Sequence, residues 1–122
     1  MGYESKIFIV EDNQNFGLPI KEPYFAEIIA SFDLCKMPYD SGFHQLFDTP
    51  APFYIFAEGP NEPTQVDRYD EPIKYADFDK VVWWCESFVR VDNYRRIPPF
   101  LASLKGFDRS KWKTLRIVHY GH

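Results

Sequence analysis

The sequence predicts an α+β domain of two layers, in which a mainly antiparallel sheet of about five strands carries two helices, 78–90 and 98–105, on one face. Three observations support this prediction. An apolar stripe of helical period begins after residue 77, a second helical segment follows closely, and strand-like segments flank the pair. The chain has 122 residues, enough for one hydrophobic core, so we expect a single domain over residues 1–122.

The first helix has the clearest periodicity in the chain. With about 100° between successive residues, its apolar side chains fall in one arc of roughly 120°, which is typical of a helix that faces a core. These side chains are Phe78, Val81, Val82, Cys85, Phe88 and Val89. Asp77 is a suitable N-cap, because its short carboxylate can accept from the free N–H groups of the first turn.

Two tryptophans in this helix have different expected environments. Trp84 lies at the edge of the apolar arc and is expected in the core. Trp83 lies about 160° from the centre of the arc, among polar residues. Either another segment covers Trp83 or its side chain is an exposed anchor for a partner.

The second helix is bounded by residues with strong local preferences. Pro98 and Pro99 have a fixed φ that suits the first turn of a helix. Gly106 is expected at the C′ position after the last turn. We therefore expect the second helix to end just before Gly106.

Before the helices, several segments favour strands. Lys6–Val10 is apolar on both alternating faces and predicts a central strand. Tyr24–Met37 fits a strand or a helix, and we favour a strand antiparallel to the first, ended by Pro38. Phe53–Glu58 is rich in aromatic and β-branched residues, so it predicts a further strand.

The remaining elements are shorter. After Ser41 the sequence predicts one or two helical turns, in which Phe43, Leu46 and Phe47 point inward. Thr64–Tyr75 predicts an edge strand interrupted at Pro72. Trp112–Tyr120 predicts a closing strand, which either completes this chain's own sheet or joins that of another subunit.

Composition narrows the class of protein. No apolar run approaches the roughly 18–20 residues of a membrane span, and the first residues lack the features of a signal peptide, so we expect a cytoplasmic protein. Cys35 and Cys85 both lie in apolar patterns and are expected to be reduced core residues. Residues 1–79 have a charge balance of −10 and residues 80–122 one of +6, which predicts either internal neutralisation or a dipolar surface.

Three segments carry a resemblance to a known group of proteins. They are ESKIFIVED at the start, ASFDLCKMP in the middle and LRIVHYGH at the end. Together they resemble small uncharacterised proteins carried by phages and prophages of Gram-positive bacteria, over most of the chain. The resemblance implies an accessory factor or an inhibitor of host machinery, anti-CRISPR proteins among them, and it implies no catalytic residues.

The sequence contains no recognisable catalytic set, so we expect no catalytic residue, no cofactor and no metal. An acidic run could in principle hold a divalent cation for a small metal-dependent hydrolase, but a solvated edge strand explains it better. The run consists of Asp67, Asp70, Glu71, Asp77 and Asp79. His119 and His122 are three apart at the end of the sequence, where a strand would not aim both at one point. His44 is expected to be partly buried among apolar residues.

The leading hypothesis is a non-enzymatic binding protein whose partner is a protein. Tryptophan and arginine are favoured at the hot spots of protein interfaces. The predicted contact patch consists of Trp83, Arg90, Arg95 and Arg96. The sequence does not specify the oligomeric state of the protein.

The alternative is nucleic-acid binding by the basic C-terminal third. There cations alternate with aromatic residues, which suits phosphate neutralisation and base stacking. The residues concerned are Lys105, Arg109, Lys111, Trp112, Lys113 and Arg116. The acidic net charge of −4 argues against this alternative, because nucleic-acid binders are usually basic.

Overall fold

The computed structural model describes residues 4–12, 25–35, 42–87, 95–112 and 114–121, with Cys35 described by its backbone only. Its elements confirm the predicted α+β class of five antiparallel strands and two helices. In chain order they are β1 (Ser5–Glu11), β2 (Glu27–Cys35), the short 3-10 helix η2 (His44–Leu46), β3 (Thr49–Pro50), β4 (Lys74–Asp77), α1 (Phe78–Ser87), α2 (Ile97–Lys105) and β5 (Leu115–Gly121).

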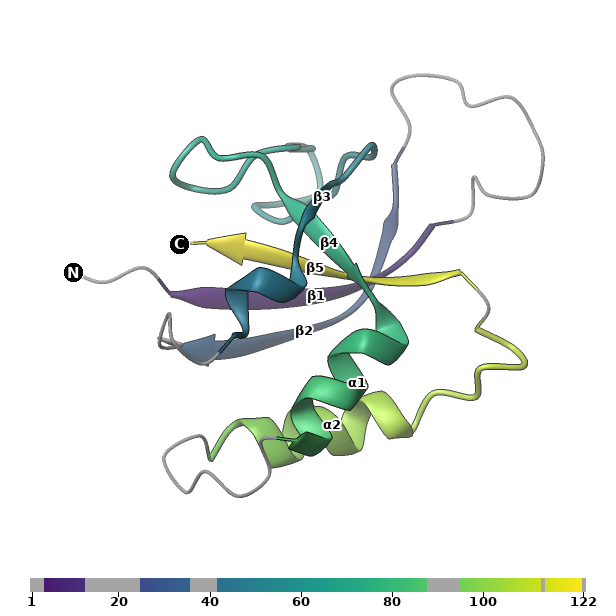
Figure 1. Cartoon of the computed structure of the whole chain (residues 1–122). Coiled ribbons are helices and arrows are strands. Elements are labelled where there is room, and N and C mark those ends of the chain that lie inside the picture. The colour runs from purple at the N-terminus through teal and green to yellow at the C-terminus, as the bar shows by residue number, and fades with distance from the viewer. Residues whose placement is uncertain (1–3, 13–24, 36–41, 88–94, 113, 122) are drawn as a thin grey trace.

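The strands form one sheet in the order β2-β1-β5-β4-β3, with every neighbouring pair antiparallel (Figure 1). β1 lies inside the sheet, as predicted. β2 is a strand antiparallel to β1, which confirms the strand prediction for residues 24–37 in the described part of that segment. β5 lies between β1 and β4, so the closing strand completes this chain's own sheet. β2 and β3 are the two edges.

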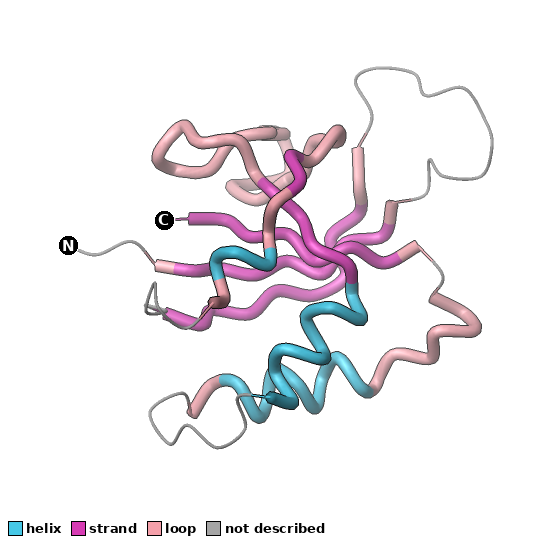
Figure 2. The backbone as a smooth tube through the Cα atoms, viewed as in Figure 1, coloured by secondary structure: helices cyan, strands magenta, loops and turns pink. Residues whose placement is uncertain are grey.

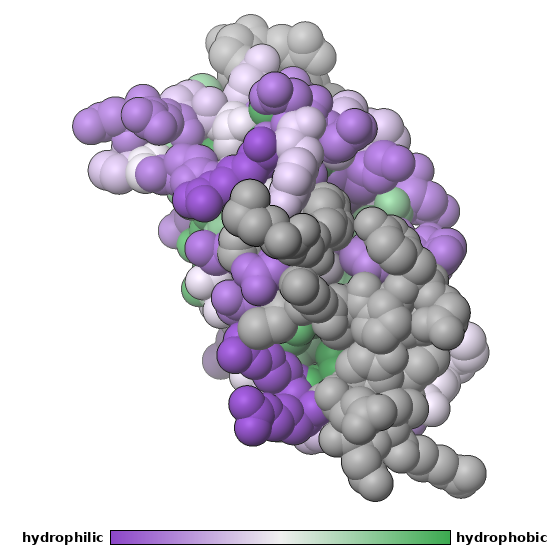
Figure 3. All heavy atoms as spheres, turned by 90° about the vertical axis from the view of Figure 1, so that its left-hand side faces the viewer, coloured by the Kyte–Doolittle hydropathy of each residue, from purple (hydrophilic) through white to green (hydrophobic). Residues whose placement is uncertain are grey.

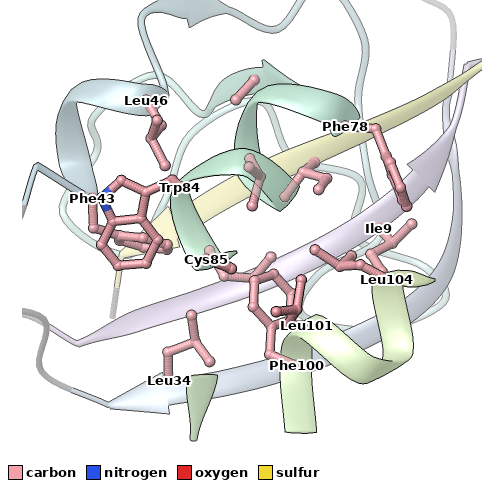
Figure 4. Packing of buried hydrophobic residues seen from close by; sticks show 14 of the residues in the cluster. Ile9, Leu34, Phe43, Leu46, Phe78, Trp84, Cys85, Phe100, Leu101 and Leu104 are labelled. Atoms are coloured by element: carbon pink, nitrogen blue, oxygen red, sulfur yellow. The ribbon is translucent and has the colours of Figure 1, made fainter. Parts of the chain in front are cut away.

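Both helices cover one face of this sheet (Figures 1 and 2). The apolar side of α1 packs through Phe78, Val81 and Cys85, while Val82 is half-buried, so four of the predicted stripe residues face the core. Phe88, Val89 and residue 90 lie outside the described residues. Trp84 is 4% exposed and packs against Phe43 in the same core, as expected (Figure 4).

The helix boundaries agree closely with the prediction. α1 begins at Phe78, directly after Asp77, which ends β4. α2 begins at Ile97, one residue before the predicted start, and has a proline at its first positions. Gly106 is the C-cap residue with a right-handed backbone, φ −75° and ψ −13°, whereas the sequence predicted that it would lie one position further out.

The opposite face of the sheet is covered by irregular chain. Phe8, Val10 and Val118 form a second apolar cluster with residues from the segment between β3 and β4. The residues of that segment that complete the cluster are Ala51, Phe53, Ile55 and Ile73. The sheet is therefore buried on both faces, which explains why β1 is apolar on both.

The predicted strand at Phe53–Glu58 is wrong. Phe53 and Ile55 are buried and Phe56 is exposed, which is the alternation that a strand also shows. The segment nevertheless makes only isolated bridges, Tyr54 with Phe25 and Ile55 with Thr64. Extended chain packed over a sheet shows the same alternation as a strand within one, and this segment covers the sheet.

The predicted edge strand Thr64–Tyr75 is also wrong in part. Only its end, from Lys74, belongs to a strand, and β4 lies between β5 and β3 rather than at the edge. The edge is the two-residue β3, which contains Pro50. Proline is tolerated in an edge strand, because no neighbour needs its missing N–H. The helical turn at His44–Leu46 is confirmed, with Phe43, Leu46 and Phe47 buried.

Neither helix in the described part of the chain has the length and apolar character needed to cross a membrane. Among the described residues, three ion pairs join residues 1–79, the acidic part of the sequence, to residues 80–122, the basic part. They are Lys80 with Asp48, Arg96 with Asp33 and Arg109 with Asp79. The charge asymmetry of the sequence is thus partly neutralised within the fold.

Candidate functional site

Trp83 lies on the outer side of α1 and is 66% exposed, the highest value among the large hydrophobic residues that the structure describes. Its neighbour Trp84 points the other way into the core, because successive residues of a helix are about 100° apart. The described atoms on the face of the molecule shown in Figure 3 are mostly hydrophilic.

Polar residues surround Trp83 on the helix at the positions three and four away. Asp79 pairs with Arg109 at 3.1 Å between Oδ1 and Nη1, and Lys80 Nζ lies 3.7 Å from Asp48 Oδ2. Glu86 Oε1 lies 3.6 Å from Lys105 Nζ, and the Ser87 hydroxyl donates to the Trp83 carbonyl oxygen at 3.0 Å. We call the surface made by Asp79, Lys80, Trp83, Glu86 and Ser87 the Trp83 face.

The two described arginines of the predicted patch lie outside α1, the helix that contains Trp83. Arg95 and Arg96 directly precede α2, and both are exposed. Arg96 reaches the edge strand β2, where its Nη1 donates to the Asp33 carbonyl oxygen at 2.7 Å and lies 3.9 Å from the Asp33 carboxylate. Arg90 lies outside the described residues. Arg96 thus contacts β2, whereas the charged residues of the Trp83 face contact Asp48, Lys105 and Arg109.

Between β2 and the start of α2 lies a groove of about 350 Å³, which we call the β2–α2 groove. Its floor is apolar, with Phe32 and Phe100 in edge-to-face contact at 5.1 Å between ring centroids. Its lining residues are Phe32, Asp33, Leu34, Arg95, Arg96, Pro99 and Phe100. The sequence predicts contacts for the two arginines but does not indicate that they border an apolar groove, because Phe32 and Phe100 are 68 positions apart and only the fold joins them.

The cations of the basic C-terminal third are largely engaged within the molecule. Lys105 pairs with Glu86, and Arg109 pairs with Asp79 while its guanidinium lies 4.3 Å from the centre of the Phe78 ring. Arg116 lies over the Tyr75 ring at 5.5 Å.

The aromatic member of this set, Trp112, is half-buried and packs edge-to-face against Phe107. Lys111 is exposed, and Lys113 lies outside the described residues. The structure therefore brings Lys105, Arg109 and Arg116 close to acidic or aromatic side chains of the same chain.

A second concavity joins the two described histidines. It has a volume of about 300 Å³ and is lined by His44, Phe47, Asp67, Glu71, Pro72, Lys74 and His119. The rings of His44 and His119 are 5.4 Å apart, and His119 Nε2 shares a hydrogen bond of 2.8 Å with the buried Ser5 hydroxyl. His44 is half-buried, as predicted. The proximity of His119 to His44 could not be predicted from the sequence, since no local spacing links residues 75 positions apart.

Burial keeps His119 neutral. It lowers the pKa of His119 from 6.5 to about 3, with a smaller contribution from the charge of His44. Ser5 is fully buried and does not line the concavity, so a substrate in that space has no access to its hydroxyl. The hydrogen bond between Ser5 and His119 is consequently a structural link between β1 and β5.

The acidic run is not arranged as a metal site in the part of the chain that the structure describes, where no group of three or more histidine, cysteine or acidic ligands comes together. Asp67 is buried, and its Oδ1 accepts from the N–H groups of Tyr69 and Glu71, so it stabilises a turn. Asp79 pairs with Arg109. Asp67 therefore does not belong to the solvated edge strand that the sequence predicted.

Cys85 is a free, fully buried thiol, as expected. Burial raises its pKa to about 12, with a smaller contribution from Glu86, so it carries almost no nucleophilic thiolate near neutral pH. No protein-family model, curated protein or solved structure matches this chain.

Proposed function

We propose that this chain is a non-enzymatic binding protein that contacts a partner protein through the Trp83 face. The observation that carries the proposal is the exposure of Trp83, whose indole is 66% accessible while the apolar side of the same helix is buried. Tryptophan is the residue most enriched at interface hot spots, since it buries a large area with few rotatable bonds.

The residues around Trp83 support this proposal. A hot spot is usually surrounded by polar contacts that exclude water from it without adding much energy themselves. Asp79, Lys80 and Glu86 each have a partner within the chain, so their side chains are partly ordered before any encounter. A partner would therefore meet an apolar centre with a preorganised polar rim, which lowers the entropic cost of binding.

Affinity capture tests the proposal with matched variants. The tagged protein is incubated with a lysate of the cells that produce it, and captured proteins are identified by mass spectrometry. Trp83→Ala is expected to lose at least about tenfold of the captured partner, as removal of a hot spot of ~2 kcal/mol or more predicts. Tyr69→Ala, which removes another large exposed ring at 48% accessibility, is the control and is expected to retain it.

Equal capture by Trp83→Ala and the wild type would contradict the proposal. Trp83→Phe keeps an aromatic ring at the same position and is expected to restore most of the captured amount. The nucleic-acid alternative receives less support from the structure, because Lys105, Arg109 and Arg116 each contact an acidic or aromatic side chain of the same chain.

A further inference from the structure

The outer edge of β2 has a short stretch with outward-facing peptide groups. The Asp12 N–H donates to the Thr114 carbonyl, which extends the β1–β5 ladder. The backbone N–H and C=O groups of the even-numbered residues of β1 therefore point toward β5. The backbone N–H and C=O groups of Ile7 therefore point toward β2, where Ile7 pairs with Phe32. Because peptide groups alternate along an antiparallel strand, those of Ser31 and Asp33 point away from β1.

Contacts at both ends limit this stretch. The Ala26 N–H donates to the Tyr54 carbonyl, so the chain just before β2 is already paired on its outer side. At the other end, Arg96 donates to the Asp33 carbonyl. The part of the β2 edge between these contacts is residues 27–32, enough for a short extended segment and too short for a long strand.

The β2–α2 groove lies beside the same stretch. Phe32 and Leu34 face the helices, so the side chains of a segment added at β2 would alternate between this groove and the opposite side of the sheet. The groove is apolar at Phe32, Pro99 and Phe100. Among its described lining residues, Arg95 and Arg96 lie at one end beside one acid, Asp33, so this end is positive. An apolar side chain followed two residues later by an acidic one would place both on the groove side.

We propose that the β2–α2 groove binds a short extended protein segment by strand addition, with an apolar residue in the groove and an acidic residue two positions away against Arg95. Main-chain hydrogen bonds to Ser31 hold the segment, and the groove selects its side chains, which is the general logic of strand addition to a sheet edge. The β2–α2 groove does not include Trp83, so this proposal and the proposed role of the Trp83 face are tested independently.

Two oriented pools of acetylated pentapeptides are the probe. The first has Leu, Ile, Val or Phe at its second position and Asp or Glu at its fourth, and the second pool has Lys or Arg at the fourth. Binding is followed by amide chemical-shift changes in the isotopically labelled full chain. The first pool is expected to bind at least about tenfold more tightly, and the changes are expected at Ser31 and Asp33.

Two variants make the experiment specific. Ser31→Pro removes an outward N–H and leaves the β1–β2 ladder intact, so binding is expected to be lost, whereas Ser31→Ala keeps it. Arg95→Glu is expected to reverse the preference between the pools. Circular dichroism and thermal unfolding verify that each variant is folded.

Several outcomes would overturn the proposal. Equal binding of the two pools, no binding of either pool at millimolar concentration, or unchanged binding by Ser31→Pro would each exclude it. Self-association of the wild type that Ser31→Pro abolishes would show that the occupant of the β2 edge is a second copy of this chain. None of these outcomes changes the capture expected through Trp83.

Discussion

His119 and Ser5 share a hydrogen bond of 2.8 Å although they are 114 positions apart in the sequence. The bond joins the last part of β5 to the first residue of β1 on the helix-covered side of the sheet. Around His119 lie the rings of Phe43, Phe47 and His44, and Lys74 is its cross-strand neighbour on β4. A neutral imidazole in this position satisfies a buried hydroxyl, while a charged one would be poorly solvated.

This environment predicts acid sensitivity. The folded protein keeps His119 neutral down to about pH 3, whereas the unfolded chain protonates it near pH 6.5. The unfolded state therefore binds more protons in this window, and the free energy of unfolding falls as the pH falls below 6.5, by at most ~1.4 kcal/mol per pH unit. Above pH 6.5 this contribution is fully present.

Urea unfolding at pH 7 and pH 5 measures the effect, and a loss of up to ~2 kcal/mol is expected in the wild type. His119→Gln is expected to have a lower free energy of unfolding than the wild type at pH 7. The decrease in this free energy between pH 7 and pH 5 is expected to be smaller in the variant. His44→Gln is the control and should keep most of the pH dependence, because burial is the main cause of the shift. An identical pH dependence in His119→Gln and the wild type would refute this explanation.

The two neighbouring tryptophans of α1 are expected to differ sharply in their effect on stability. Trp84→Ala removes a ring that is 4% exposed and packs against Phe43, so it should cost ~3–5 kcal/mol. Trp83→Ala removes a ring from the surface and should change the free energy of unfolding by no more than ~0.5 kcal/mol. Denaturant unfolding of both variants under one condition decides the matter. Comparable losses would mean that Trp83 is packed rather than exposed.

Glu58 accepts hydrogen bonds from both Arg68 and the Tyr120 hydroxyl. These bonds lower its pKa from 4.5 to about 2, and the bond from Arg68 is the largest cause. Arg68→Ala should therefore raise the pKa of Glu58 toward 4.5 by more than Tyr120→Phe does. Carbon-13 NMR titration of the Glu58 carboxyl group in both variants measures the two shifts, and the reverse order would contradict the assignment.

Cys85 is expected to resist thiol reagents in the folded protein. Its pKa of about 12 leaves very little thiolate at pH 8, and the side chain is fully buried. Iodoacetamide at pH 8 should leave Cys85 unmodified in the native protein and modify it in urea, as shown by peptide mass mapping. Rapid modification in the native state would mean that α1 opens readily from the core.

Much of the fold could be predicted because its signals are local. The stripe that contains Phe78, Val81 and Cys85 specifies a buried helix face, and the two-sided apolar pattern of Lys6–Val10 specifies a strand buried on both faces. Phe53–Glu58 could not be placed correctly, because alternating burial is the same for a strand inside a sheet and for an extended chain lying over it.

The candidate sites were less predictable for a related reason. The exposure of Trp83 depends only on its angular position around the helix axis relative to the apolar residues, so it could be inferred from the sequence. The β2–α2 groove and the contact between His44 and His119 depend on which strand pairs with which. Pairing over such separations has no local signature, so only the folded chain reveals those neighbours.

Fluorescence quenching tests the central claim, that a partner protein covers Trp83, most directly. In a variant with Trp84→Phe and Trp112→Phe, Trp83 is the only remaining tryptophan. Its emission should be quenched strongly by acrylamide in the free protein, and the quenching constant should fall severalfold when the purified captured partner is added. An unchanged quenching constant in the saturated complex would show that the partner binds elsewhere.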